Sequence, residues 1–146
     1  MRKSILLLLS TVALAVPSVN AWAASRQILS STTVKKKVVV ATKSFTGTAG
    51  QADRWGNVQV TIVVRKTTTT VGTKKTVARK ITKVTVPVYP NHTDRSVYIN
   101  QQALPYLVQE TLKAQSSKIY AVSGATDTSY AFAQSLQAAI VHAKAW

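Results

Sequence analysis

Cysteine is absent from this 146-residue sequence, and histidine occurs only twice. Without cysteine the chain cannot form disulfides, Cys/His zinc sites or iron–sulfur clusters, and it cannot carry a lipid on an N-terminal cysteine. The two histidines, His92 and His142, lie far apart, and neither has the spacing of a metal-ligand pair. The sequence therefore predicts no metal site, and it predicts a fold stabilised by packing and by any bound cofactor.

Long apolar runs are also lacking, except near the N-terminus. Residues 5–16 are mostly apolar, follow the cations Arg2 and Lys3, and are too short to span a bilayer comfortably. This pattern, followed by small residues that suit a cleavage site, is typical of a secretory signal peptide. We therefore expect residues 1–23 to be a signal peptide and the protein to be extracytoplasmic, whether periplasmic, cell-surface or secreted. An uncleaved N-terminal anchor is the alternative.

Acidic residues are scarce: the chain has 4 Asp and Glu against 19 Lys and Arg, a formal net charge of +15. Such an excess draws a protein to anionic surfaces such as lipid headgroups or wall polymers, in a salt-sensitive way. The export signal argues against nucleic acid as a partner. Residues 24–43 are polar and lysine-rich, and we expect a flexible basic N-terminal segment there, although the valines at 38–40 could add a strand at a sheet edge.

Residues 44–146 are expected to form one domain. Apolar and polar residues alternate over 58–65 and again over 83–88, a period of two that predicts two strands with one face on a core. The simplest arrangement is an antiparallel hairpin, and Pro87, which lacks an N–H, places the second strand at a sheet edge or its end at a bulge. The connection, residues 66–80, is rich in Thr and Lys, so it either extends the hairpin as a basic ribbon or forms a mobile solvated loop.

A first helix is predicted after these strands. Leu104 and Leu107 lie at helical spacing with the apolar residues that follow them, and Asn100 is a candidate N-cap. Pro105 would interrupt a helix that began much earlier, so the regular helix is expected to start near Ala103 or Leu104.

A second helix is predicted over residues 128–144, entered from a short strand at 118–122. A few strands followed by two helices indicate an α+β fold, a small antiparallel sheet with two main helices packed on it.

The turn before the last helix, residues 123–129 (SGATDTS), is the candidate binding site. Its hydroxyls, the small residues Gly124 and Ala125, and the free N–H groups of a helix start together suit a phosphate. Taken alone, a Ser/Thr-rich helix start is more often only a cap.

The same turn, with its surroundings, resembles the FMN-binding domain family. That family includes small exported flavoproteins and the flavin-bearing C and G subunits of the sodium-translocating quinone reductase and Rnf complexes, in which S-G-A-T-x-T-S follows a strand and precedes the last helix. The likeness extends to Thr46 and Gly47 and to residues 54–60 and 81–84, so it covers nearly everything after about residue 44. The resemblance implies FMN as cofactor, with its phosphate held by Ser123, Gly124, Ala125, Thr126, Thr128 and Ser129.

The resemblance also implies a place for the flavin ring. By analogy the ring would lie in a slot walled by Trp55, Gly56, Leu104 and Leu107. On its own residue type, Trp55 is more often a core residue of a small domain than a flavin platform.

In this family the hydroxyl of the first Thr of the motif can be joined to FMN through a phosphodiester, and that residue is Thr126 here. Members with covalent FMN usually carry an Asp six positions earlier, which the flavin transferase reads, and this chain has Tyr120 there. Covalent and noncovalent FMN therefore both stay open.

Together these features predict an exported, membrane-associated FMN-binding protein that passes electrons between a membrane or extracellular donor and an acceptor. An electron carrier is favoured over a substrate-specific enzyme because no Asp, His and Glu constellation marks a second site and no catalytic acid or base is expected. The alternative is a secreted basic adhesion or scaffold domain that has lost flavin, with Tyr120 as its motivating feature.

Overall fold

The longest strands, β3 (Asn57–Val71) and β4 (Lys74–Val88), form an antiparallel hairpin that organises the sheet. The computed structural model describes residues 34–146, so the expected signal peptide and the first part of the basic segment lie outside the described residues. Strand β1 (Lys36–Thr46) pairs antiparallel with β3, and the short strand β2 (Gly50–Gln51) pairs with its first residues.

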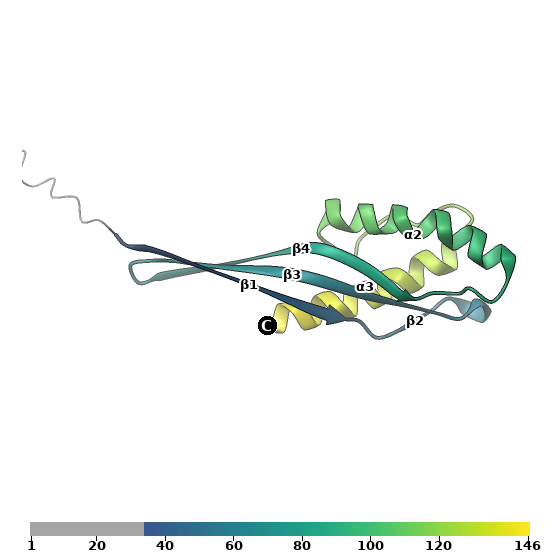
Figure 1. Cartoon of the computed structure of the whole chain (residues 1–146), viewed down its shortest axis with the longest axis horizontal. Helices are drawn as coiled ribbons and strands as arrows, with labels where there is room; N and C mark the ends of the chain where they lie inside the picture. The colour runs from purple at the N-terminus through teal and green to yellow at the C-terminus, as the bar shows by residue number, and fades with distance from the viewer. Residues whose placement is uncertain (1–33) are drawn as a thin grey trace, which may run out of the picture. The chain divides into compact units, whose positions relative to one another are not determined.

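A 3-10 turn, η1 (Asp53–Trp55), connects β2 to β3, and two helices, α2 (Asp94–Ala114) and α3 (Thr126–Ala145), follow β4. Figure 1 shows both helices beside one end of the three long strands. The antiparallel four-stranded sheet with two helices confirms the predicted α+β class.

The core lies between β3 and α3. In β3 the alternation predicted from the sequence is present, and its inward side chains Val58, Val60, Ile62 and Val64 are buried. They pack against a cluster that includes Phe132, Leu136 and Ala139 of α3 and Leu107 of α2. Burial of this apolar surface is what fixes α3 on the sheet.

Close contact between α3 and the sheet depends on two glycines. A Cβ at Gly47 would clash with the carbonyl oxygen of Ser135, and one at Gly50 would clash with the carbonyl oxygen of Ala131. Val60 of β3 lies between the residues that pair with β1 and those that pair with β2. Its N–H donates a hydrogen bond to the Ser135 hydroxyl at 2.9 Å. A small polar residue of α3 thus satisfies a buried backbone donor that strand pairing leaves free.

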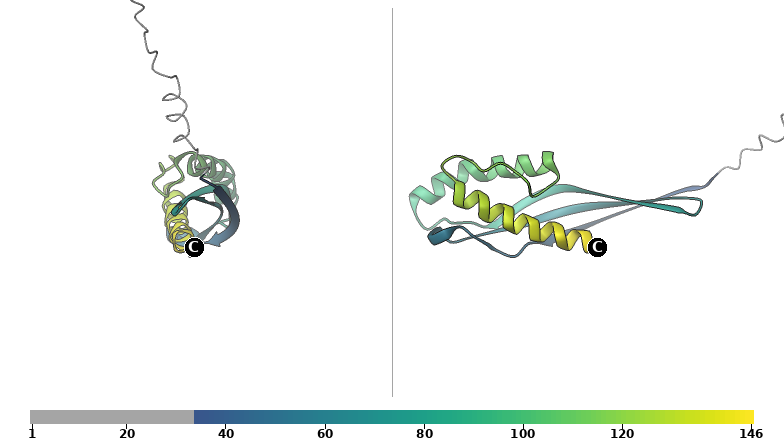
Figure 2. Two further views of the ribbon diagram at one scale, coloured as in Figure 1. Left: turned by 90° about the vertical axis from the view of Figure 1, so that its left-hand side faces the viewer. Right: turned by 180° about the vertical axis from the view of Figure 1, so that it is seen from behind.

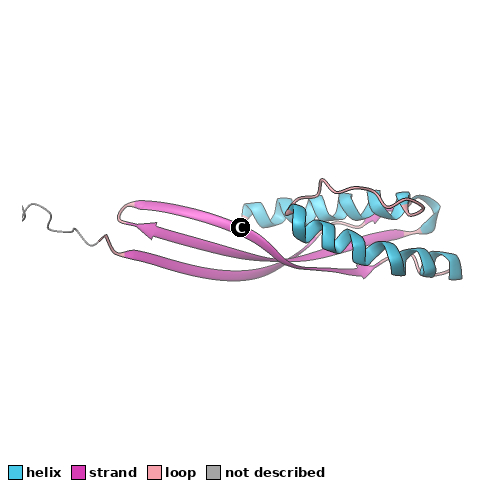
Figure 3. Ribbon diagram, turned by 90° about the horizontal axis from the view of Figure 1, so that it is seen from above, coloured by secondary structure: helices cyan, strands magenta, loops and turns pink. Residues whose placement is uncertain are grey.

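Beyond the core, β1, β3 and β4 continue together as a three-stranded extension that we call the basic ribbon (residues 36–42, 65–71 and 74–80). Figure 3 shows these strands running past the ends of the helices to a tight turn. The turn consists of Gly72, with φ 60°, and Thr73, so residues 66–80 form a regular hairpin, which is the ribbon alternative.

The expected flexible segment is wrong from residue 36 onward, because β1 pairs with β3 from Lys36 opposite Val71 to Thr46 opposite Thr61. The alternative of an added edge strand at residues 38–40 is what the structure has. The reason is that β3 is long enough to offer its free edge to the whole of β1.

Helix α2 begins nine residues before Ala103, where its start was predicted. Thr93 is the N-cap, and its hydroxyl and the Ser96 side chain form a reciprocal capping box. Pro105 lies inside the helix, and Asn100 is a buried residue of its interior rather than its N-cap. The prediction was wrong because a strong capping box outweighed the local cost of one interior proline.

The short strand expected at 118–122 is also absent from the described part of the chain, where residues 115–125 are irregular. On the edge of β4, the Gln115 side-chain amide accepts from the N–H of Ile81 at 2.7 Å and donates to its carbonyl oxygen at 3.0 Å. A single side chain thus takes the backbone partners that another strand would use there. Helix α3, by contrast, lies within two residues of its predicted bounds.

Candidate functional site

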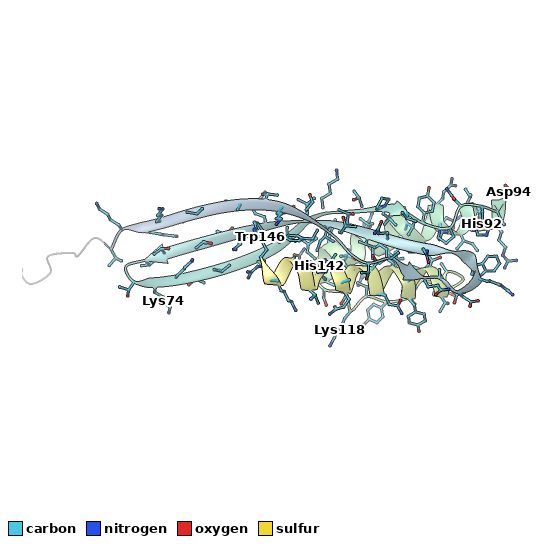
Figure 4. The ribbon with its side chains drawn as sticks, turned by 90° about the horizontal axis from the view of Figure 1, so that it is seen from below. Lys74, His92, Asp94, Lys118, His142 and Trp146 are labelled. Carbon is cyan, nitrogen blue, oxygen red and sulfur yellow. The ribbon has the colours of Figure 1, made fainter. Side chains whose placement is uncertain are left out.

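A shallow cleft lies where the start of α2, the loop before it, η1 and the N-terminus of α3 meet. Its volume is about 60 Å³, and it is lined by Trp55, Pro90, Arg95, Ser96, Ile99, Asn100 and residues 124–128. Figure 4 shows His92 and Asp94, which precede and begin α2, at this end of the domain, far from Lys74 at the tip of the ribbon. The structure thus brings Trp55 together with most of the predicted turn.

The turn enters α3 through a glycine in a left-handed conformation. Gly124 has φ 81°, and a Cβ there would meet no atom within 4 Å, so the space above it is open. Ala125 is the N-cap, and no side chain caps the helix. The N–H groups of Thr126, Asp127 and Thr128 therefore precede the first intrahelical bond, which is donated by Ser129 to the carbonyl oxygen of Ala125 at 2.9 Å.

The hydroxyls of the turn divide into two groups. Ser129 and Thr128 are buried and engaged: the Ser129 hydroxyl donates to the Ala125 carbonyl oxygen at 2.8 Å and accepts from the Val122 N–H at 3.0 Å. Thr126 is exposed and forms the first residue of α3. Two hydroxyls predicted to reach a phosphate thus stabilise the turn, while Thr126 faces the cleft.

Asn100 connects the three segments that shape the cleft. Its side chain is only 1% exposed; its amide N–H donates to the Pro90 carbonyl oxygen at 2.7 Å, and its amide oxygen accepts from the Thr128 hydroxyl at 2.9 Å. The loop before α2, α2 itself and the start of α3 are therefore joined through one buried amide.

Sequence analysis missed this role for Asn100, although a signal for it exists. Asn100 lies three residues before Ala103 and seven before Leu107, on the buried face of α2. A polar residue on an apolar helix face has to find hydrogen-bond partners, which points to a structural connection.

Charge in the cleft comes from two side chains, because Arg95 and Asp127 are the only charged residues among those lining it. Arg54 lies outside the lining, with its guanidinium carbon 5.0 Å from the centre of the Trp55 ring. Trp55 itself is half-buried and is not part of the hydrophobic core. Trp55 therefore lines the cleft and does not fill the core role that its residue type favours.

Four predicted site residues lie elsewhere. Leu107 is fully buried in the core, Leu104 packs against that core, and neither Gly56 nor Ser123 lines the cleft. Leu104 and Leu107 were misplaced because α2 begins earlier than expected, so the first turns of the helix, not its middle, face the turn at α3. The cleft residues supplied by those first turns, Arg95, Ser96 and Ile99, could be found only by recognising the capping box.

No protein-family model matches the chain. No curated protein matches it either. Among residues 34–146, no group of His, Asp and Glu side chains is arranged to hold a metal ion, and neither helix is long and apolar enough to cross a membrane. The interpretation of the cleft therefore depends on the chemistry of its own residues.

Proposed function

We propose that this cleft binds FMN and that the protein is an exported electron-transfer module. The single observation that carries the proposal is the uncapped N-terminus of α3, which opens into a cleft through a turn with the sequence SGATDTS. Export is proposed from the pattern of residues 1–23, which lie outside the described residues.

The phosphate of FMN would be held by the start of α3. Three N–H groups without intrahelical partners, those of Thr126, Asp127 and Thr128, combine with the positive end of the helix dipole to favour an anion. Gly124 lets a ligand approach the backbone closely, and Arg95 adds a cation to the lining. Each charge-assisted hydrogen bond of this kind contributes about 1.5–3 kcal/mol.

The flavin ring would contact the apolar part of the lining, which consists of Trp55, Pro90 and Ile99. A cleft of about 60 Å³ is far smaller than the roughly 300–1,000 Å³ of pockets that enclose a ligand. A bound flavin would accordingly stay largely open to solvent. That exposure suits electron exchange with another macromolecule better than the enclosed chemistry of a small substrate.

FMN, when bound, supplies one- and two-electron chemistry. The chain's own residues position it. Of the charged side chains in the lining, Arg95 favours an anion and Asp127 opposes one, so the preference for a phosphate comes mainly from the free N–H groups at the start of α3. Only one cation and one carboxylate, Arg95 and Asp127, line the cleft, so its residues offer no paired acid and base. These features support an electron carrier over a substrate-specific enzyme.

A covalent bond to FMN is proposed at Thr126 only. Its side chain is exposed at the first position of α3, so a transferase could reach it. Tyr120, in the position where covalently modified members of the resembled family carry Asp, is 79% exposed. Intact mass of the purified protein, compared between wild type and Thr126→Ala, distinguishes covalent from noncovalent flavin.

The test of the proposal is visible absorbance of protein purified from a flavin-replete host. Flavin absorbance bands that stay with the protein through purification support the proposal. Release of the colour on denaturation indicates noncovalent FMN, and retention indicates a covalent bond. Colourless protein that takes up no added FMN contradicts the proposal.

That last result would favour the second candidate function, a secreted basic adhesion or scaffold domain without flavin. The observation that favours it is the basic ribbon, whose eight Lys and Arg side chains are accompanied by no acidic residue. The two candidates differ in whether the cleft holds FMN, and the absorbance measurement tests this directly.

A further inference from the structure

The positive charge of this protein is concentrated in the basic ribbon. The basic ribbon carries eight cations and no carboxylate, and they are Lys36, Lys37, Arg65, Lys66, Lys74, Lys75, Arg79 and Lys80. All four acidic residues of the chain, Asp53, Asp94, Glu110 and Asp127, lie outside it, three of them at the start of η1, α2 or α3. Figure 4 shows the two ends, with Lys74 at one and Asp94 at the other.

The strand register divides these cations between the two faces of the ribbon, with four on each. Residues 62 and 64 of β3 face the helices, so residues 65, 67, 69 and 71 and their cross-strand partners lie on the opposite face. On this helix-free face the rows, from the tip inward, are Lys36, Val71 and Lys74; Val38, Thr69 and Thr76; Val40, Thr67 and Ala78; and Thr42, Arg65 and Lys80.

The valines in these rows are unusually open to solvent. Val38 is 50%, Val40 57% and Val71 42% exposed, in a segment with no part of the core beneath it. Apolar side chains framed by cations are the combination that a bilayer surface recognises, since the cations reach headgroup phosphates and the apolar groups enter the interface.

A single-stranded nucleic acid would need a different surface. Stacking on bases uses aromatic side chains, and the basic ribbon contains none. Wall polymers and other soluble polyanions would use the cations but would gain little from exposed valines.

The two faces of the ribbon are not equally accessible. On the side of the helices, the C-terminal residue Trp146 covers its base: the Lys66 ammonium donates to the Trp146 carbonyl oxygen and lies 4.8 Å from the centre of its ring. Both views in Figure 2 show α3 ending beside the strands on this side. A planar surface can therefore approach only the helix-free face along the full length of the ribbon.

We propose that the helix-free face of the basic ribbon docks on a bilayer that contains anionic lipids. Lys36 and Lys74 at the tip and Arg65 and Lys80 at the base contact headgroup phosphates, and the valines between them enter the interface. The contact holds the protein at a membrane and leaves the cleft, at the other end of the domain, free. It depends on the ribbon alone and does not require the cleft to bind FMN.

The test is co-sedimentation of the full chain with vesicles of pure phosphatidylcholine and with vesicles that contain about one third phosphatidylglycerol. The apolar residues 5–16 would contribute equally to both, so the difference between the two vesicle types reports the contribution of positive charge. We expect binding at least a hundredfold tighter to the anionic vesicles at about 0.1 M salt, and a loss of that difference at about 0.5 M. Equal binding to both vesicle types overturns the proposal.

A matched pair of variants separates the ribbon from net charge. Lys36→Gln, Lys74→Gln and Lys80→Gln together should weaken binding to anionic vesicles about a hundredfold, because each surface cation contributes about a fivefold factor. The control removes the same charge from exposed positions of the helical half, with Lys113→Gln, Lys118→Gln and Lys144→Gln. It should change binding by less than about threefold. Equal losses in both variants would mean that attraction to the membrane is not localised on the ribbon.

A second variant tests the choice of a bilayer over a soluble polyanion. Val38→Thr, Val40→Thr and Val71→Thr together keep the charge and the β propensity of the ribbon, and they should weaken vesicle binding about tenfold. Binding to soluble polyphosphate should not change. Unchanged vesicle binding, with polyphosphate or single-stranded DNA competing for the same sites, would make the ribbon a general polyanion site and would overturn the proposal.

Discussion

Replacing Asn100 by alanine should loosen the cleft and lower the stability of the whole domain. The Asn100 amide is buried and makes both of its hydrogen bonds to other segments, the Pro90 carbonyl oxygen and the Thr128 hydroxyl. Asn100→Ala removes both bonds at once and leaves their partners in a buried environment.

The expected loss follows from these contacts. A hydrogen bond contributes a net stability of about 1 kcal/mol, and a buried group left without its partner costs about 1–3 kcal/mol. Because Asn100 also lines the cleft, water can enter and pair with part of what remains, which places the loss at about 2–4 kcal/mol. For a domain of this size, that corresponds to a fall in Tm of roughly 10 °C.

The assay is chemical denaturation of Asn100→Ala, Thr128→Val and the double variant. Thr128→Val keeps the shape of the side chain and removes one donor, so it should cost about 1 kcal/mol, and the double variant should lose less than the sum of the two. Gln102→Ala, on the exposed side of the same helix, is the control for helix propensity. A loss below about 0.5 kcal/mol for Asn100→Ala would refute the reasoning, since surface substitutions already span that range.

Three further predictions concern other contacts. Ser135→Ala should lower the free energy of unfolding by about 1–3 kcal/mol in the same denaturation assay, because the buried N–H of Val60 loses its acceptor. Gln115→Ala should cost about 1–2 kcal/mol and should raise amide hydrogen exchange at Ile81, whose N–H the Gln115 side chain binds. Trp55→Ala should weaken FMN binding at least about tenfold by fluorescence titration, because it removes an apolar wall of the cleft, with little change in Tm.

Each of these predictions has an outcome that contradicts it. Wild-type stability in Ser135→Ala would mean that the Val60 N–H finds another partner. Unchanged exchange at Ile81 in Gln115→Ala would mean that the side chain does not protect the edge of β4. A large fall in Tm for Trp55→Ala would mean that Trp55 stabilises the core of the domain.

The parts of the fold that could be predicted are those in which a repeating pattern meets one face of a core. The alternation of Val58, Val60, Ile62 and Val64 indicated β3, and the apolar stripe of Phe132 and Leu136 indicated α3 within two residues of its ends. Both patterns are local and agree with their tertiary surroundings, so the sequence alone is enough.

The parts that could not be predicted depend on partners far away in the sequence. Residues 36–42 bury little and become a strand only because β3 offers a long free edge. Helix α2 begins earlier than the sequence predicts, because the capping box at Thr93 and Ser96 outweighs the local cost of Pro105. Residues 118–122 are irregular instead of forming the expected strand, and at Ile81 the Gln115 side chain binds the backbone groups on the outer edge of β4.

The candidate site shows the same division. The turn at 123–129 could be found because its composition and its position before a helix are local features. The residues opposite it, including Arg95 and Asn100, reach the cleft only through the packing of α2 against α3, and a single sequence does not reveal which turn of one helix meets the end of another. Leu104 and Leu107 were assigned to the site for that reason and belong to the core.

The most direct test of a phosphate site at the start of α3 is to titrate the purified full chain with FMN and with riboflavin, which has the same ring but no phosphate. Three helix N–H groups and Arg95 acting on the phosphate predict FMN binding at least about a hundredfold tighter than riboflavin binding. Equal affinity for the two flavins, or no binding of either, would contradict the central claim.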